Sequence, residues 1–299
     1  MQFEYSDHDR DSELAPGAGP QHPPSPPPPG PQRPRMVPVQ GPSTRPIAAY
    51  ILLAIIVGIY LLGQIVPLQP VIVKGYLANS AEDWLFIQGA KLNEFIIRDR
   101  EVYRLLTAMF LHGGLMHLFF NGYALYVIGT NVERVYGHAR FLLVYFLGGL
   151  TGSLFSLLFS SYASVGASGA IFALFGAELV FVYRHRDLFG RAAYRQLQNM
   201  IFLLALNILI GLSPGSRIDN WGHIGGFLAG VGLSWLIGPS FRLSLANGRP
   251  WSAVELATPG MPLPALELVD DNPLQKRLFV PFAYAAVYVL ILGVVLQRG

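Results

Sequence analysis

Apolar and polar stretches alternate along the whole chain of 299 residues. Several apolar runs are shorter than the roughly 20 residues that cross about 30 Å of hydrocarbon. Short runs are expected where helix ends line a water-filled cavity. The pattern therefore predicts an all-α, polytopic bundle of membrane helices. Its seven apolar segments cover approximately Ile47–Val66, Leu115–Val132, Phe141–Phe159, Ser168–Tyr183, Met200–Leu212, Trp221–Ile237 and Leu278–Leu296.

Polar sequence flanks this apolar region. The first 46 residues hold few large apolar side chains and a nearly continuous run of proline, which predicts a disordered tail with polyproline II character. This tail is either simply solvated or a ligand for an SH3-type domain. No signal peptide precedes the first apolar run, which is expected to act as a signal-anchor. The expected domains are the cytoplasmic tail 1–46, the core 47–238, a cytoplasmic linker 239–277 and a seventh span within 278–299.

Basic residues beside the spans predict the orientation of the chain. A cytoplasmic N-terminus puts most of them on the inner face, whereas the outer loops 160–167 and 213–220 contain one arginine between them. In the first outer loop, about residues 67–112, basic and acidic side chains balance. We therefore expect the N-terminus inside and the C-terminus outside. The inner basic residues are Arg33, Arg35, Arg45, Arg134, Arg140, Arg184, Arg186, Arg191, Arg195, Arg242, Arg249, Lys276 and Arg277.

Composition supports a membrane protein. Hydrophobic residues make up 52% of the chain, charged residues only 13%, and the mean hydropathy is +0.42. A formal net charge of +3 requires no nucleic-acid partner. The absence of cysteine excludes disulfides, thiolate metal sites and a cysteine nucleophile. The absence of an organelle-targeting segment favours a bacterial plasma membrane.

Polar side chains near the outer ends of three spans are the candidate chemistry, because polar groups inside spans are costly. Ser168 lies 16 residues before Arg184, hence roughly 24 Å above the inner boundary at about 1.5 Å per residue. His223 and His117 lie at similar depths by the same measure, and Asn121 is one helical turn deeper than His117. This common level suggests a hydrolytic nucleophile and its base below the membrane surface.

Small residues recur at four-residue spacing beneath both Ser168 and His223. Such faces let helix backbones pack closely in lipid. If the two stripes face each other, Ser168 and His223 come within hydrogen-bond reach. Otherwise the small residues of the stripes are ordinary packing residues. One stripe is Gly222, Gly226, Gly230 and Ser234, and the other is Gly169, Ala173 and Ala177.

Three motifs resemble the rhomboid family of intramembrane serine proteases, and the resemblance covers about residues 47–238. The order of the motifs and their placement in the spans agree with that family. They are the stretch from His112 to Asn121, the G-x-S-G element at 166–169, and Gly222-His223-Ile224-Gly225-Gly226 followed by Gly230. Glu101-Val102-Tyr103-Arg104 resembles a further E-x-W-R element with tyrosine for tryptophan. Glu133-Arg134 with Gly137 resembles another element of the family. The last span is similar to the six-plus-one arrangement of many rhomboids.

The resemblance implies roles for these residues. Ser168 would be the nucleophile and His223 its general base, while His117, Asn121 and the backbone N–H of Ser168 would hold the oxyanion. Asp219 is expected to be exposed, so no acid completes a triad. No metal and no cofactor are required. The residues expected to shape the site are Gly166, Gly169, Phe172, Gly226 and Gly230, with Phe172 standing where some relatives carry tyrosine.

Other interpretations stay open for single residues. His117 and Asn121 could form an interhelical hydrogen-bond clamp, and His112 has either a structural or a catalytic role. A metal site built from His112 and His117 is disfavoured, because a five-residue spacing points them to different helix faces. No HExxH element supports a zinc protease.

The sequence predicts an intramembrane serine endopeptidase that cleaves transmembrane protein substrates in the lipid bilayer. One rival is an inactive rhomboid-like protein that binds membrane helices, although such relatives usually lose the serine or the histidine. The second rival is a small transporter, which would show inverted repeats that this sequence lacks.

Overall fold

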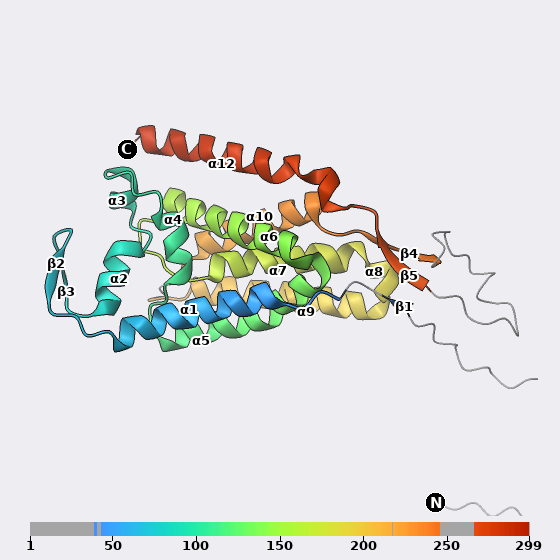
Figure 1. The fold of residues 1–299 in the computed structure, drawn as a ribbon, viewed down its shortest axis with the longest axis horizontal. Helices are drawn as coiled ribbons and strands as arrows, with labels where there is room; N and C mark the ends of the chain where they lie inside the picture. The colour runs from blue at the N-terminus through green and yellow to red at the C-terminus, as the bar shows by residue number, and fades with distance from the viewer. Residues whose placement is uncertain (1–38, 41–42, 217, 246–265, 299) are drawn as a thin grey trace, which may run out of the picture. The chain divides into compact units, whose positions relative to one another are not determined.

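The computed structural model describes residues 39–40, 43–216, 218–245 and 266–298. Within them, long helices lie side by side in a bundle (Figure 1), as the predicted all-α membrane fold requires. The expected tail lies almost wholly outside the described residues. The long helices are α1 (Ile47–Ile65), α5 (Leu115–Ala124), α6 (Thr130–Phe159), α7 (Ser168–Arg184), α9 (Arg191–Gly211), α10 (Asn220–Ile237) and α12 (Phe279–Arg298).

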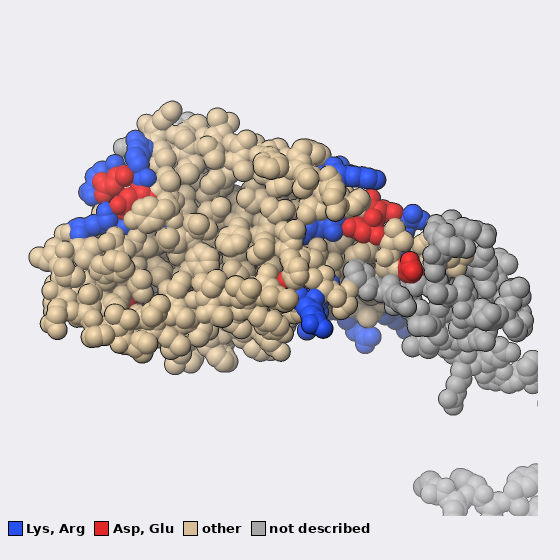
Figure 2. All heavy atoms as spheres, viewed as in Figure 1, with Lys and Arg blue, Asp and Glu red and all other residues tan. Residues whose placement is uncertain are grey.

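The surface and the helix lengths both fit a membrane environment. Figure 2 shows an almost uncharged band between two ends that carry Lys, Arg, Asp and Glu. Within the described ranges, three helical stretches are long and apolar enough to cross a membrane, namely Ile47–Ile65, Leu115–Phe159 and Leu274–Gln297. At 17 residues, α7 is shorter than a full span and is surrounded by other helices.

One continuous helical stretch connects α5 to α6 through the π-helical segment η2 (Leu125–Gly129). Its backbone leaves helical geometry at Gly137, where φ is 75°, a conformation that glycine adopts without steric cost. This break lies between the two predicted segments Leu115–Val132 and Phe141–Phe159. Just before the break, buried Glu133 accepts hydrogen bonds from the backbone N–H groups of Ala48 (2.9 Å) and Ala49 (2.7 Å). Glu133 therefore caps the N-terminus of α1 from a distant helix.

The segment predicted to be the first outer loop is a folded unit arranged around the buried Arg104. It contains a hairpin of β2 (Val71–Val73) and β3 (Tyr76–Ala78), followed by α2 (Ala81–Gly89), α3 (Asn93–Ile97), α4 (Arg104–Thr107) and the short η1 (Ala108–Phe110). Arg104 is fully buried. Its guanidinium donates to Glu101 (2.7 Å) and to the carbonyl of Ala90 (3.0 Å), and lies 4.7 Å from the ring of Phe95.

Short strands, which the sequence analysis did not predict, form where the linker was expected. The strand β5 (Leu266–Asp270) pairs with β4 (Phe241–Leu245) on one side and with β1 (Val39–Gln40) on the other. Arg140 of α6 donates to Asp270 at 2.8 Å, and His185, at the end of α7, accepts the N–H of Phe241 at 2.8 Å. The linker is therefore tied to the helix ends rather than being a simple connection.

The C-terminal helix α12 packs against α6 through two tyrosines. The hydroxyl of Tyr284 lies 2.6 Å from the Thr151 hydroxyl, and Tyr288 donates to the carbonyl of Leu150 at 3.1 Å. These hydrogen bonds give the predicted seventh span a defined docking position on the core.

Glycine permits the closest packing in the bundle, which is between α7 and α10. A Cβ added at Gly226 would overlap the backbone of Gly169, and one at Gly230 would overlap the backbone of Ala173. One turn further along, the Ser234 hydroxyl donates to the carbonyl of Ala177 at 3.3 Å. The two small-residue stripes therefore face each other, as their proposed role requires.

We predict that Gly230→Ala destabilises the protein, because its methyl group would meet the rigid backbone of α7. Overpacking of this kind costs about 1–3 kcal/mol. The matched control is Gly232→Ala in the same helix, where nothing lies within 4 Å of the added methyl. Thermal unfolding in detergent measures both variants. Equal melting temperatures for the two variants would contradict the packing argument.

Candidate active site

Ser168 and His223 meet at the same end of the bundle. Ser168 is the first residue of α7, and His223 lies in the first turn of α10. The Ser168 Oγ and the His223 Nε2 are 2.9 Å apart, a hydrogen-bond distance. An imidazole nitrogen at this distance can take the proton of the hydroxyl and so make the oxygen nucleophilic.

An aromatic ring fixes the orientation of the imidazole. Phe172 lies one turn below Ser168 on α7 and stacks on the ring of His223, with centroids 4.2 Å apart and an angle of 12° between the planes. The buried histidine is thus held between α7 and the rest of α10. The contact needs the flat face of a ring and does not use a tyrosine hydroxyl.

The loop before Ser168 brings His117 close to the serine. Gly166 has a φ of +126°, and a Cβ added there would lie 2.7 Å from the Nε2 of His117 and 3.8 Å from the Ser168 Oγ. His117 itself lies in the first turn of α5. Glycine at 166 therefore serves two needs, because it adopts the left-handed conformation and leaves room for the imidazole.

The side-chain amide of Asn121, the second expected oxyanion donor, forms a hydrogen bond within its own helix. The residue is buried one turn along α5, and its side-chain amide donates to the backbone carbonyl of His117 at 2.9 Å. This bond lies within one helix, so it is not the interhelical clamp that the sequence left open. The structure brings Ser168, His223, Phe172, Gly166 and His117 together, and places Asn121 behind His117.

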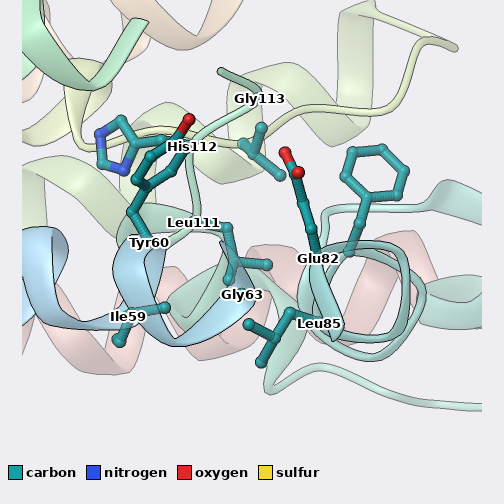
Figure 3. Close-up of a pocket in the computed structure, with 10 residues that line it drawn as sticks. Ile59, Tyr60, Gly63, Glu82, Leu85, Leu111, His112 and Gly113 are labelled. Atoms are coloured by element: carbon teal, nitrogen blue, oxygen red, sulfur yellow. The ribbon is translucent and has the colours of Figure 1, made fainter. Parts of the chain in front are cut away.

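His112 belongs to the surroundings of the site. Its ring lies 5.2 Å from that of His117, with an edge-to-face geometry. Burial and the neighbouring His117 lower the pKa of His112 to about 4, so its ring is neutral at pH 7. A cavity of about 40 Å³ adjoins it, lined also by Tyr60 of α1 and Glu82 of α2 (Figure 3).

The expectation that Asp219 is exposed is wrong. Asp219 is half-buried at the N-cap of α10, where its carboxylate accepts the N–H of Gly222 at 3.0 Å. Its backbone carbonyl accepts the N–H of His223 at 3.1 Å. Asp219 therefore orders the turn that carries the histidine. An aspartate immediately before a helical run is an N-cap signal that the sequence analysis could have used.

Three helices begin at the site, and the electrostatics depend most on the N-terminus at Ser168, because the Asp219 carboxylate already caps that of α10. The helices α5, α7 and α10 begin at Leu115, Ser168 and Asn220, all close to the Ser168–His223 pair. The first N–H groups of a helix lack intrahelical acceptors, and the dipole makes this end positive. Such a place stabilises an anion, including an oxyanion that forms during a reaction.

Comparison with known proteins agrees with the motifs. Residues 99–240 match the family described as "Rhomboid domain". The chain is 47% identical over 142 residues to Rhomboid protease GluP of Bacillus subtilis, covering 48% of this chain and 27% of that protein. It is 36% identical over 165 residues to RHOMBOID-like protein 1 of Arabidopsis thaliana, covering 54% of this chain and 42% of that protein. The chain thus spans less than half the length of these relatives.

We predict that the flat ring of Phe172 supports the reactivity of Ser168. Phe172→Leu keeps an apolar side chain without a ring, and should slow labelling of Ser168 by a fluorophosphonate about 2- to 10-fold, since aromatic pairs contribute about 0.5–1.5 kcal/mol. Phe172→Tyr keeps the ring and is the control, expected to react at the wild-type rate. Equal labelling rates for the leucine and tyrosine variants would rule out a role for stacking.

Proposed function

This chain belongs to the rhomboid family, and we propose that it is an intramembrane serine endopeptidase that cleaves transmembrane protein substrates. The observation that carries the proposal is the 2.9 Å contact between the Ser168 Oγ and the His223 Nε2. The name of the Bacillus subtilis relative, Rhomboid protease GluP, supports the same reaction class.

In the proposed mechanism, two residues perform the proton transfers. His223 Nε2 takes the proton of Ser168 as its oxygen attacks the carbonyl carbon of the scissile peptide bond. The protonated imidazole then donates that proton to the leaving amine, which leaves an acyl-enzyme on Ser168. A water molecule, deprotonated by the same imidazole, hydrolyses the ester and restores the serine. Phe172 keeps the imidazole plane in place throughout.

The oxyanion of each tetrahedral intermediate is proposed to lie between His117 and the backbone N–H of Ser168. The proximity of His117 to Gly166 supports this position, as does the helix N-terminus at Ser168. We propose that Asn121 assists by holding the backbone of His117 through its 2.9 Å bond.

The protein is an integral membrane protein, and we propose that its active end faces outward from the cytoplasm. The supporting observation is the excess of arginine in the loops at the other end. A site a few ångströms below the outer surface can receive water from that side. A substrate helix must unwind locally there, because its peptide bonds are otherwise shielded by side chains and hydrogen bonds.

Ser168→Ala and His223→Ala should each abolish cleavage of a reporter transmembrane substrate by the purified protein in liposomes. The physical reason is the loss of the nucleophile in one case and of its base in the other. Ser161→Ala, an exposed serine in the preceding loop, is the matched control and should cleave normally. Unchanged product yield from Ser168→Ala would end the protease proposal and favour the inactive, helix-binding alternative.

His117→Ala should lower kcat by about 10²–10³, the usual cost of losing one oxyanion donor. Asn121→Ala should cost less, because it would act through the backbone of His117. Initial cleavage rates over a range of substrate concentrations separate kcat from KM for both variants. A larger loss of kcat in Asn121→Ala than in His117→Ala would show that the asparagine, and not the histidine, is the donor.

A further inference from the structure

Lys91 is a buried cation close to the active end of the bundle, in the first outer loop between α2 and α3. Its side chain is almost completely buried, with an exposed fraction of 1%. A buried ammonium is costly unless its hydrogen bonds are satisfied. Its Nζ lies within hydrogen-bond distance of four oxygens: the carbonyls of Tyr162 (2.7 Å), Ser156 (3.3 Å) and Ser160 (3.3 Å), and the Asn93 side chain (2.9 Å).

The three carbonyl oxygens belong to the end of α6 and to the loop that follows it. The last carbonyls of a helix lack intrahelical donors, and a cation there also complements the helix dipole. Asn93 adds to this cap, since its amide donates to the carbonyl of Ser160 at 2.9 Å. Lys91 and Asn93 thus close the C-terminus of α6 from the first outer loop.

The backbone of Lys91 holds the same loop nearer to the serine. Its N–H donates to the carbonyl of Ser164 (3.0 Å), and the N–H of Ser164 donates back to Lys91 (3.1 Å). Two residues later, the N–H of Gly166 donates to the carbonyl of Ala108 (2.9 Å). The loop from α6 to Ser168 is therefore tied to the first outer loop at its beginning, its middle and its end.

These contacts affect the active site because different segments of the chain position the serine and the histidine. Ser168 follows directly on the loop that Lys91 holds, whereas His223 is carried by α10 and its Asp219 cap. A shift of the loop would thus move the Ser168 Oγ relative to the His223 Nε2. Displacements of about 1 Å can cost about 10²-fold in rate.

We propose that Lys91 is a positioning residue of the active site, whose ammonium sets the place of Ser168 by holding the end of α6 and the loop beyond it. The proposal rests on the proposed serine protease function. Lys91 touches neither the reacting atoms nor the substrate, and acts only through the loop.

Lys91→Met keeps the length of the side chain and removes the three donors. We expect kcat to fall roughly 10- to 100-fold, with KM changed less than about twofold, since the substrate-binding surface is not touched. The rate of fluorophosphonate labelling of Ser168 should fall in parallel. Lys276→Met, which makes the same change at an exposed lysine, is the control and should match the wild type.

The outcomes separate this proposal from the one on which it rests. Wild-type kcat and labelling in Lys91→Met, while Ser168→Ala is inactive, overturn the positioning role alone. A fall confined to KM overturns it as well. Cleavage by Ser168→Ala would instead overturn the protease function itself.

If Lys91→Met does not fold, kcat and KM of the wild type measured as a function of pH test the positioning role of Lys91 instead. Burial lowers the pKa of Lys91 to about 8, and the carboxylate of Asp219, the charged group that acts on it, opposes this shift. The other groups around the ammonium, carbonyls and Asn93, are uncharged. Loss of its proton removes a donor, so kcat should decline through this pH while KM stays constant. A kcat that is constant well above this pH overturns the proposal.

Discussion

The contact between α7 and α10 is the constraint on which the rest of the structure depends. Lipid supplies no hydrophobic force that would draw one apolar helix to another, so the helices associate through close van der Waals contact. At Gly226 and Gly230 the contact is backbone to backbone, with no space for a Cβ. Because these positions lie one turn apart, they determine the register of the two helices. The first turns of both helices are then level, and Ser168 and His223 face each other.

Helix ends, rather than helix middles, carry the chemistry of this protein. Three helices begin near the candidate active site: the positive N-terminus of α7 lies at Ser168 itself, whereas the N-terminus of α10 is capped by the Asp219 carboxylate. Two other helix ends are closed by buried charges of the appropriate sign from distant segments. Glu133 closes the N-terminus of α1, and Lys91 closes the C-terminus of α6. Each buried charge is thus stabilised by several hydrogen bonds while it joins two parts of the chain.

Much of the candidate site could be predicted from short-range sequence order. Helical periodicity puts Ser168, Gly169 and Phe172 in known relation to each other, and puts Gly226 one turn below His223. Counting residues from the charged ends of the spans then assigns each group a depth. Such arguments work because a membrane helix is nearly rigid and satisfies its own backbone hydrogen bonds. They do not extend to Lys91, because nothing in its neighbours reveals that it reaches the end of α6.

The sequence by itself determined the all-α membrane class, the approximate places of the long apolar helices and the residues that can face the site, because these follow from apolar periodicity and helical rise. Only the tertiary structure decided how those residues are used. It directs the side-chain amide of Asn121 to the backbone of its own helix and places Asp219, half-buried, at the N-cap of α10. It also pairs β4 with β5 in the linker. These outcomes depend on hydrogen bonds between segments far apart in the chain, and local composition does not encode which donor finds which acceptor.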